Sequence, residues 1–248
     1  MSSHFKTAIL MATYNGENYL KEQIYSILNQ SKLPDIIYIL DDFSTDSTYK
    51  LLLEISNKNS RVIVNRNQTN IGVVNTFEKL LLGVDADIVF LCDQDDVWHN
   101  RKVELMCSEF VESNVQCVIS NATVIHEDGS PSHLLFADYF PGGMSIFNQL
   151  IKNHFIGCCM AVRRSVINNS LPFPQKIPMH DWWLGSVALS LGAVKFLPQP
   201  LICYRRHSST VTGRGRRSLF KIFLNRYNAI VALLFILKRN FVSYIQNE

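Results

Sequence analysis

The chain has 248 residues, of which 47% are hydrophobic and 18% charged, with a formal net charge of +3. This composition excludes a disordered chain and suits one large domain, or one domain with an appendage. Its six cysteines form no Cys-x-x-Cys pair and lie mostly in apolar runs, which is typical of reduced, buried thiols in a cytosolic protein. The N-terminus runs into a strand without an apolar signal region, so we expect no secretion.

Charge is unevenly distributed along the chain. Residues 182–248 contain ten Lys and Arg and one acidic residue, whereas residues 1–181 contain fourteen Lys and Arg and twenty acidic residues. The basic part includes an apolar run at 227–237 with cations on both sides, too short for a bilayer span, which needs about 20 residues. We expect 219–248 to form a basic helical tail on an anionic membrane surface, unless it is a last core helix or a dimer contact. The basic patch at 214–217 lacks interleaved aromatic residues, so no nucleic-acid partner is expected.

Apolar strands alternate with amphipathic helices over the first hundred residues. The pattern predicts strands at 7–12, 36–40, 61–64 and 88–91 and helices at 19–28, 46–55 and 72–82. Such alternation favours βαβ units with parallel strands and right-handed crossovers. We therefore predict an α/β fold with a mostly parallel central sheet flanked by helices.

The pattern of the second half is less regular. It predicts a strand at 115–126 that enters a hairpin, a short helix at 145–152 and a buried strand at 154–160. Gly157 within that strand permits close approach of a ligand, unless it is a packing glycine or a bulge. A proline-rich loop at 172–178 then leads to a helix that begins near His180.

Polar residues follow each of the four strands predicted in the first half. These clusters lie at 13–16, 41–46, 70–72 and 93–96. Each alone is ordinary turn or cap chemistry. Because ligands of an open parallel sheet bind outside the carboxyl ends of its strands, the four clusters together predict a binding cleft.

The last cluster places three carboxylates within four residues, Asp93, Asp95 and Asp96, at the end of an apolar strand. Carboxylates so close repel one another and are costly at a buried strand unless a cation or hydrogen-bond donors compensate them. Oxygen ligands of this kind suit Mg²⁺ or Mn²⁺, which proteins often hold with one or two carboxylates and the phosphate oxygens of a substrate. The alternative is a solvated acidic turn.

Three short motifs, in this order, resemble the family 2 inverting glycosyltransferases of the glycosyltransferase A fold. They are Ala-Thr-Tyr-Asn-Gly at 12–16, Asp-Asp-Phe-Ser-Thr-Asp at 41–46 and Asp-Gln-Asp-Asp-Val-Trp at 93–98. The form of the last motif, with His-Asp-Trp-Trp at 180–183 and Tyr-Arg-Arg-His at 204–207, is most similar to bacterial rhamnosyltransferases of surface-polysaccharide synthesis. The resemblance covers nearly the whole chain. It implies a catalytic domain at 1–218, with a nucleotide-sugar-binding half at 1–98 and an acceptor half at 99–218, before the tail.

On the donor side, the resemblance implies a site for a nucleotide diphosphate sugar, linked to dTDP or UDP. The residues expected there are Ala12, Thr13, Tyr14, Asn15, Asp41, Asp42, Asn70, Gly72, Asp93, Gln94 and Asp95. The nucleotide base is expected against Ala12, Thr13 and Asp42. A divalent metal, Mg or Mn, is expected at Asp93, Asp95 and His207.

On the acceptor side, Asp181 is the candidate catalytic base. It lies at a helix N-terminus, where the dipole and free N–H groups stabilise an ionised carboxylate, although a simple N-cap is the alternative. The supporting residues are expected to be Asp96, Gly157, His180, Trp182, Trp183, Arg205 and Arg206. One of the two tryptophans is expected in the core and the other against a sugar, and the two arginines near the diphosphate.

The implied reaction is an inverting, metal-dependent transfer of a sugar, with rhamnose as one candidate, to a hydroxyl of a glycan or lipid-linked glycan. Asp181 would deprotonate that hydroxyl for an in-line displacement while the metal stabilises the departing diphosphate. Such an enzyme would act in surface-polysaccharide or lipopolysaccharide synthesis, peripherally on the cytoplasmic face of the inner membrane. The alternative is a non-catalytic nucleotide-sugar-binding or scaffold protein of the same fold. A sugar nucleotidyltransferase is disfavoured because no Gly-rich phosphate loop follows the first strand.

Overall fold

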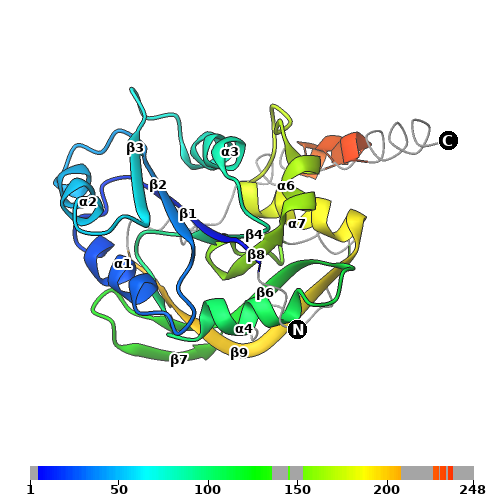
Figure 1. Ribbon diagram of the computed structural model, residues 1–248. Coiled ribbons are helices and arrows are strands. Elements are labelled where there is room, and N and C mark those ends of the chain that lie inside the picture. The colour runs from blue at the N-terminus through cyan, green and yellow to red at the C-terminus, as the bar shows by residue number, and fades with distance from the viewer. Residues whose placement is uncertain are drawn as a thin grey trace.

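The computed structural model describes residues 5–135, 145, 153–207, 226–228, 230–232 and 234–236. One curled sheet runs through the molecule, and in the view of Figure 1 helices α3, α6 and α7 lie above β4 and β8, α1 and α2 lie on the left, and α4 lies between β6 and the lower strands β7 and β9. Its strand order is β3-β2-β1-β4-β8-β6-β9-β5, and β7 pairs with β6. The predicted α/β architecture with a helix-flanked central sheet is therefore confirmed.

The first half of the chain forms a parallel sheet with helical crossovers, as predicted. Its elements are β1 (Thr7–Thr13), α1 (Leu20–Leu28), β2 (Ile36–Asp41), α2 (Thr48–Ser56), β3 (Val62–Arg66), α3 (Val73–Gly83) and β4 (Ile88–Cys92). Strands β1 and β4 are almost fully buried, which explains why both read as continuous apolar runs. All four strands are parallel and in register, so their carboxyl ends meet at one edge.

The second half adds a mixed sheet. Its elements are β5 (Val97–Trp98), α4 (Lys102–Glu109), β6 (Val115–Ile125), β7 (Pro131–Leu135), η2 (Gly157–Cys159), β8 (Met160–Arg163), α6 (Arg164–Ser170), α7 (His180–Leu191) and β9 (Ala193–Arg205). Here β6 and β9 are parallel, whereas β8 is antiparallel to both β4 and β6, and β5 is antiparallel to β9. The sheet is thus mixed rather than mostly parallel, because β8 enters beside β4 from the opposite direction instead of through a helical crossover.

The strand predicted at 154–160 is wrong over most of its length. The chain forms the 3-10 turn η2, and β8 begins only at Met160. Local bonds explain the difference, since the N–H of Cys159 donates to the carbonyl of Ile156 and the N–H of Gly157 donates to the side chain of Asp181. These groups are not available for strand pairing. The helix predicted at 145–152 lies outside the described residues, apart from Ser145.

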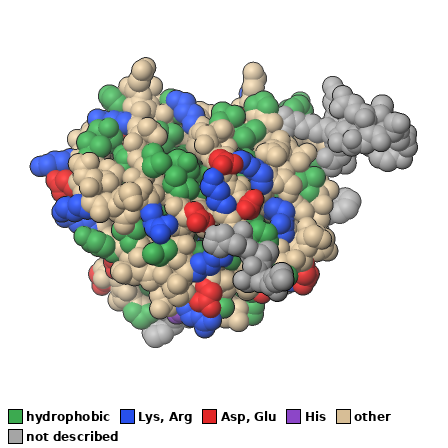
Figure 2. Space-filling view, in the orientation of Figure 1, with side chains coloured by type: hydrophobic (Ala, Val, Ile, Leu, Met, Phe, Trp, Pro, Cys, Tyr) green, Lys and Arg blue, Asp and Glu red, His purple; other side chains and the backbone are tan. Residues whose placement is uncertain are grey.

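The described part of the C-terminal tail is helical at 226–228, 230–232 and 234–236. Ala232 and Ile236 are buried in the main hydrophobic core, so one face of this helix packs against the domain. None of the described helices is long and apolar enough to cross a membrane. On the face shown in Figure 2, Lys and Arg side chains are interspersed with Asp and Glu, so charges of both signs neighbour one another there.

Candidate active site

The loops that follow β1, β2 and β4 are joined by hydrogen bonds at the carboxyl edge of the sheet. The side-chain oxygen of Asn15 accepts from the N–H of Thr45 at 2.8 Å, and the N–H of Gly16 donates to the hydroxyl of Thr48 at 2.8 Å. Asn15 has a positive φ of 48°, which asparagine tolerates better than most residues. The polar clusters predicted from the sequence therefore form one connected rim.

Gln94 connects the acidic loop to the loop after β1. Its amide oxygen accepts from the N–H of Tyr14 and its amide nitrogen donates to the carbonyl of the same residue, each at 2.9 Å. A Cβ atom on Gly16 would lie only 2.3 Å from the Gln94 amide oxygen, so glycine is required for this contact. Gln94 thus shapes the loop after β1, whereas the Tyr14 side chain is 46% exposed and accessible to a ligand.

The two carboxylates after β2 bind the protein itself. Asp41 is fully buried, pairs with the Arg66 guanidinium at 3.1 Å and accepts from the N–H of Ser44 at 3.0 Å. It also accepts from the hydroxyl of Thr13, while Ala12 beside it is partly buried. Asp41 is therefore a structural anchor of the rim, and any contact of Ala12 or Thr13 with a nucleotide base stays a prediction.

Asp42 holds the loop that begins α3. Its carboxylate accepts from the side-chain amide of Asn67 at 2.8 Å and from the N–H groups of Ile71 and Gly72 at 2.9 and 2.8 Å. Gly72 has a φ of 83°, where glycine is favoured, and Asn70 caps its N–H at 3.2 Å. Asp42 thus ties the third polar cluster to the loop after β2, and its contact with a nucleotide base stays a prediction.

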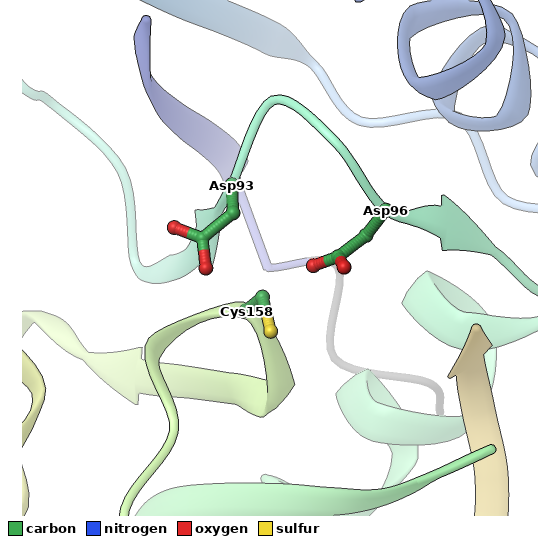
Figure 3. Close-up of side chains that lie close together, drawn as sticks. All are labelled: Asp93, Asp96 and Cys158. Carbon is green, nitrogen blue, oxygen red and sulfur yellow. The ribbon is translucent and has the colours of Figure 1, made fainter. Parts of the chain in front are cut away.

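Asp93 and Asp96 converge on the thiol of Cys158 (Figure 3). One ligand atom from each of the three residues lies within 4.8 Å of the others, and we call this group the acidic cluster. Asp96 is buried, and one of its oxygens accepts from the N–H of Arg205 at 3.0 Å, whereas the other has no hydrogen-bond partner among the described residues. Burial, reinforced by the charges of Asp95 and Asp181, raises the pKa of Asp93 to about 7.

Asp95 and His207 form a second group beside the acidic cluster. The Nε2 atom of His207 lies 2.7 Å from a carboxylate oxygen of Asp95, and the ring of Tyr19 lies 5.1 Å from the His207 ring. The predicted ligands Asp93, Asp95 and His207 thus fall into two neighbouring groups. Among the residues that the structure describes, the three-residue group with the ligand atoms closest together contains Asp96 and Cys158 instead.

The donor set of this region fits a divalent cation. Four carboxylates, Asp93, Asp95, Asp96 and Asp181, influence one another electrostatically, and burial, with the charges of Asp95 and Asp93, raises the pKa of Asp96 well above its usual range. One buried oxygen of Asp96 also lacks a donor. Oxygen ligands with excess negative charge are the environment that Mg²⁺ and Mn²⁺ favour.

Asp181 lies at the N-terminus of α7 and is 9% exposed. Its carboxylate accepts from the N–H groups of Trp182 at 2.6 Å and Gly157 at 3.2 Å and from the side-chain amide of Asn153 at 3.3 Å. Burial nevertheless raises its pKa to about 6. A carboxylate with this pKa is ionised at neutral pH and basic enough to take a proton from a hydroxyl in a transition state.

His180 precedes Asp181 and is 5% exposed. Its ring stacks on Phe77 of α3 with centroids 4.0 Å apart, and both ring nitrogens lack hydrogen-bond partners among the described residues. Burial lowers the pKa of the imidazole to about 3, so the ring is neutral. A Cβ atom on Gly157 would lie 3.0 Å from the Nε2 atom of His180. This contact supports the alternative that Gly157 is a packing glycine, which leaves room for the His180 ring.

The prediction that one tryptophan of α7 faces a sugar is wrong. Trp182 is 2% exposed and Trp183 is fully buried, and the indole N–H of Trp183 donates to the carbonyl of Ser170 at 3.0 Å. Helix α7 is covered on all sides over its first nine residues, so adjacent positions that point in different directions are both in the core.

Arg205 serves as a buried clamp. Its guanidinium donates to the carbonyls of Asp95 and Glu127 at 2.9 and 3.0 Å and pairs with Glu22 at 2.7 Å. These contacts fasten the acidic loop to α1 and to the β6–β7 hairpin, and they oppose the predicted role of Arg205 at a diphosphate. Arg206 is exposed, and its contact with a diphosphate stays a prediction.

Sequence reasoning missed three residues of the site. Lys102 and Cys158 are fully buried beside the carboxylates, and Asn153 donates to Asp181. No sequence signal marks Lys102, because a lysine in an amphipathic helix is expected at the surface. Cys158 is buried, as expected for the cysteines in general, but the sequence does not show that its thiol lies between Asp93 and Asp96.

An α/β fold whose parallel half ends in polar loops, next to a group of clustered carboxylates, is the arrangement of the glycosyltransferase A fold. The chain belongs to glycosyl transferase family 2, which matches residues 8–171. It is a glycosyltransferase, as the motifs in its sequence indicate.

Two relatives act in transfer reactions of known donors. The dTDP-rhamnosyl transferase RfbG of Shigella flexneri is 29% identical over 216 residues, which cover 82% of this chain and 73% of that protein. The UDP-Glc:alpha-D-GlcNAc-diphosphoundecaprenol beta-1,3-glucosyltransferase WfgD of Escherichia coli is 26% identical over 218 residues, or 87% and 83% of the two chains. The solved structure of S. aureus TarS 1-349 in complex with UDP-GlcNAc has a TM-score of 0.70 at 17% identity, over 96% of this chain and 73% of that one, and supports the fold.

Proposed function

We propose that the protein transfers a sugar from a dTDP- or UDP-linked donor to a hydroxyl of a glycan or lipid-linked glycan, with inversion at the anomeric carbon. The observation that carries this proposal is that one turn, Gly157–Cys159, adjoins both Asp181 and the acidic cluster. A base and a site for the leaving diphosphate are then held by the same backbone. Surface-polysaccharide synthesis is the proposed context, because RfbG uses dTDP-rhamnose and WfgD acts on a diphospholipid-linked sugar, as their names state.

In the proposed mechanism, the N–H groups of Trp182 and Gly157 hold the Asp181 carboxylate so that it can accept the proton of the acceptor hydroxyl. That oxygen then attacks the anomeric carbon from the side opposite the diphosphate. Asp93, Asp95 and His207 would hold a divalent cation with Asp96 in support, and Tyr14 and Arg206 would contact the donor. When bound, the cation would supply positive charge that stabilises the leaving diphosphate.

The test is donor turnover by purified protein. Incubation with dTDP-rhamnose or UDP-glucose and Mn²⁺ should release the nucleoside diphosphate, and EDTA should suppress that release. Asp181→Asn should reduce transfer while nucleotide binding, followed by calorimetry, persists. Absence of both turnover and binding across dTDP- and UDP-sugars would favour the scaffold alternative.

A membrane surface is the proposed partner of the C-terminal helix. Tyr227, Ile230, Val231 and Leu234 follow helical spacing on one face and are between 47% and 59% exposed, opposite the buried Ala232 and Ile236. We call these four exposed residues the apolar stripe. The stripe lies within residues 182–248, which contain ten Lys and Arg and a single acid. This positive charge would complement anionic headgroups, and the proposed location is the cytoplasmic face of the membrane.

Vesicle flotation tests this partner. The protein should float with phosphatidylglycerol vesicles and not with phosphatidylcholine vesicles, and the double variant Ile230→Ser, Leu234→Ser should lose binding. Leu82→Ser, which changes a 64% exposed leucine on α3, is the matched control and should bind as wild type does. Unchanged vesicle binding by the double variant would refute the proposal, as would a double variant that instead loses a dimer seen by light scattering.

A further inference from the structure

Lys102 is a buried cation that the proposed mechanism does not use. It lies in the first turn of α4 and is fully buried. Burying an ammonium group costs several kcal/mol unless charges or hydrogen bonds compensate it. A lysine at such a position therefore needs a physical reason.

The contacts of Lys102 connect it to the turn Gly157–Cys159. Its ammonium group donates to the carbonyl of Cys158 and lies 4.0 Å from the centre of the Trp98 ring. Through the same turn, the N–H of Gly157 bonds to Asp181, and the thiol of Cys158 lies between Asp93 and Asp96. Lys102 therefore holds the segment that touches both the base and the acidic cluster.

The charge of Lys102 also acts on the acidic cluster without occupying it. Its ammonium group bonds to the carbonyl of Cys158, the residue whose thiol lies within 4.8 Å of a carboxylate oxygen of both Asp93 and Asp96. Its described contacts are a carbonyl and an aromatic ring, rather than a carboxylate. The carboxylate oxygens thus remain available to a ligand, while part of their mutual repulsion is relieved.

We propose that Lys102 is a positioning residue for the transfer reaction, an inference that rests on the proposed function. It fixes the turn that aims Asp181, and it places one positive charge at the backbone of Cys158 in the acidic cluster, so that a cation is held loosely enough to leave with the product diphosphate. Packing alone would require neither effect.

The test is Lys102→Met, which keeps the length and apolar stem and removes the charge and the donor. We expect Mn²⁺ affinity at pH 8.5, measured by electron paramagnetic resonance, to increase about tenfold, because a repelling unit charge is removed. Removing the charge of Lys102 also strengthens proton binding at the same carboxylates. A proton carries half the charge of Mn²⁺, so its affinity increases less and its competition does not cancel the increase in Mn²⁺ affinity. Transfer should decrease at least about tenfold, because the turn is released. If Lys102 served only in packing, its replacement would not increase the Mn²⁺ affinity and decrease the rate of transfer together.

Lys195→Met is the matched control, because Lys195 pairs with Glu109 and Glu112 away from the acidic cluster, and it should leave both readouts unchanged. If the Met variant does not fold, Lys102→Gln removes the charge but keeps a donor, and its Mn²⁺ affinity should still increase. Unchanged or weaker Mn²⁺ binding in a folded variant, or unchanged transfer, would overturn the inference and leave the proposed function standing. A wild-type protein that neither turns over a donor nor binds Mn²⁺ would refute the proposed function, and this inference with it.

Discussion

Replacing Asp181 with Asn should remove activity and also change how stability depends on pH. Burial raises the pKa of Asp181 from an ordinary value of 3.8 to about 6, so the folded protein binds this proton more tightly than the unfolded chain does. At roughly 1.4 kcal/mol per pH unit, ionisation of this carboxylate costs the fold about 3 kcal/mol. The cost is absent below the unfolded pKa near 4, grows as the pH rises and is complete above about 6.

The Asn variant carries no such charge. Its amide makes different hydrogen bonds with Gly157 and Trp182 than a neutral carboxyl group does, and this difference is the same at every pH, because the bonds made by the carboxylate are already included in its raised pKa. We therefore expect the free energy of unfolding of the variant, minus that of wild type, to rise by about 3 kcal/mol between pH 4 and pH 7.5. The absolute difference at any one pH depends on the lost hydrogen bonds, whereas its slope depends on Asp181.

The assay is urea denaturation of both proteins at a series of pH values in EDTA, with transfer measured in parallel with Mn²⁺. Loss of a general base should reduce transfer about 10²- to 10⁴-fold, and wild-type transfer should fall as the pH drops through about 6. A stability difference that does not change with pH, or that turns in favour of wild type as the pH rises, would refute the reasoning. Asp181 would then be a solvated or paired cap rather than a buried base.

Three further predictions concern residues around the site. His180→Phe should raise the free energy of unfolding by about 1–3 kcal/mol in thermal unfolding, because it removes two buried nitrogens without partners, and a lower melting temperature would contradict this. Gly16→Ala should weaken UDP and dTDP binding about tenfold in calorimetry, because a Cβ atom at this position would displace the Gln94 side chain. Gly83→Ala is the control, because the space around Gly83 is open. Equal nucleotide affinities of the two variants would refute the argument. Asp95→Ala should weaken Mn²⁺ binding and transfer at least about tenfold, and unchanged binding would place the cation wholly within the acidic cluster.

The first half of the fold was predictable because each strand there is an apolar run followed by polar turn residues. Strands β1 and β4 are covered on both faces, and α1 and α3 bury the apolar face that their spacing indicated. The second half was less predictable, because pairing between β8 and its neighbours depends on contacts distant in sequence. The turn η2 in particular is set by the side chain of Asp181, 24 residues further along the chain.

The same distinction applies to the site. Carboxylates in motifs were found from the sequence, because Asp93, Asp95 and Asp181 are unusual at strand and helix ends. Their partners were not, because Lys102 and Cys158 acquire a role only through tertiary packing. The tryptophans of α7 were misassigned for a related reason, since helical spacing says which faces differ but not that every face is covered.

The hydrogen bonds between the loops after β1 and β2 bear on how the donor is captured. Asn15 and Gly16 are tied to Ser44, Thr45 and Thr48 by the protein's own groups, without a ligand. The conformational entropy of ordering this rim is therefore lost during folding, and it does not reduce the affinity for the nucleotide. The amide hydrogens of Gly16 and Thr45 should exchange slowly with and without nucleotide, so that association is limited by diffusion and docking rather than by loop ordering.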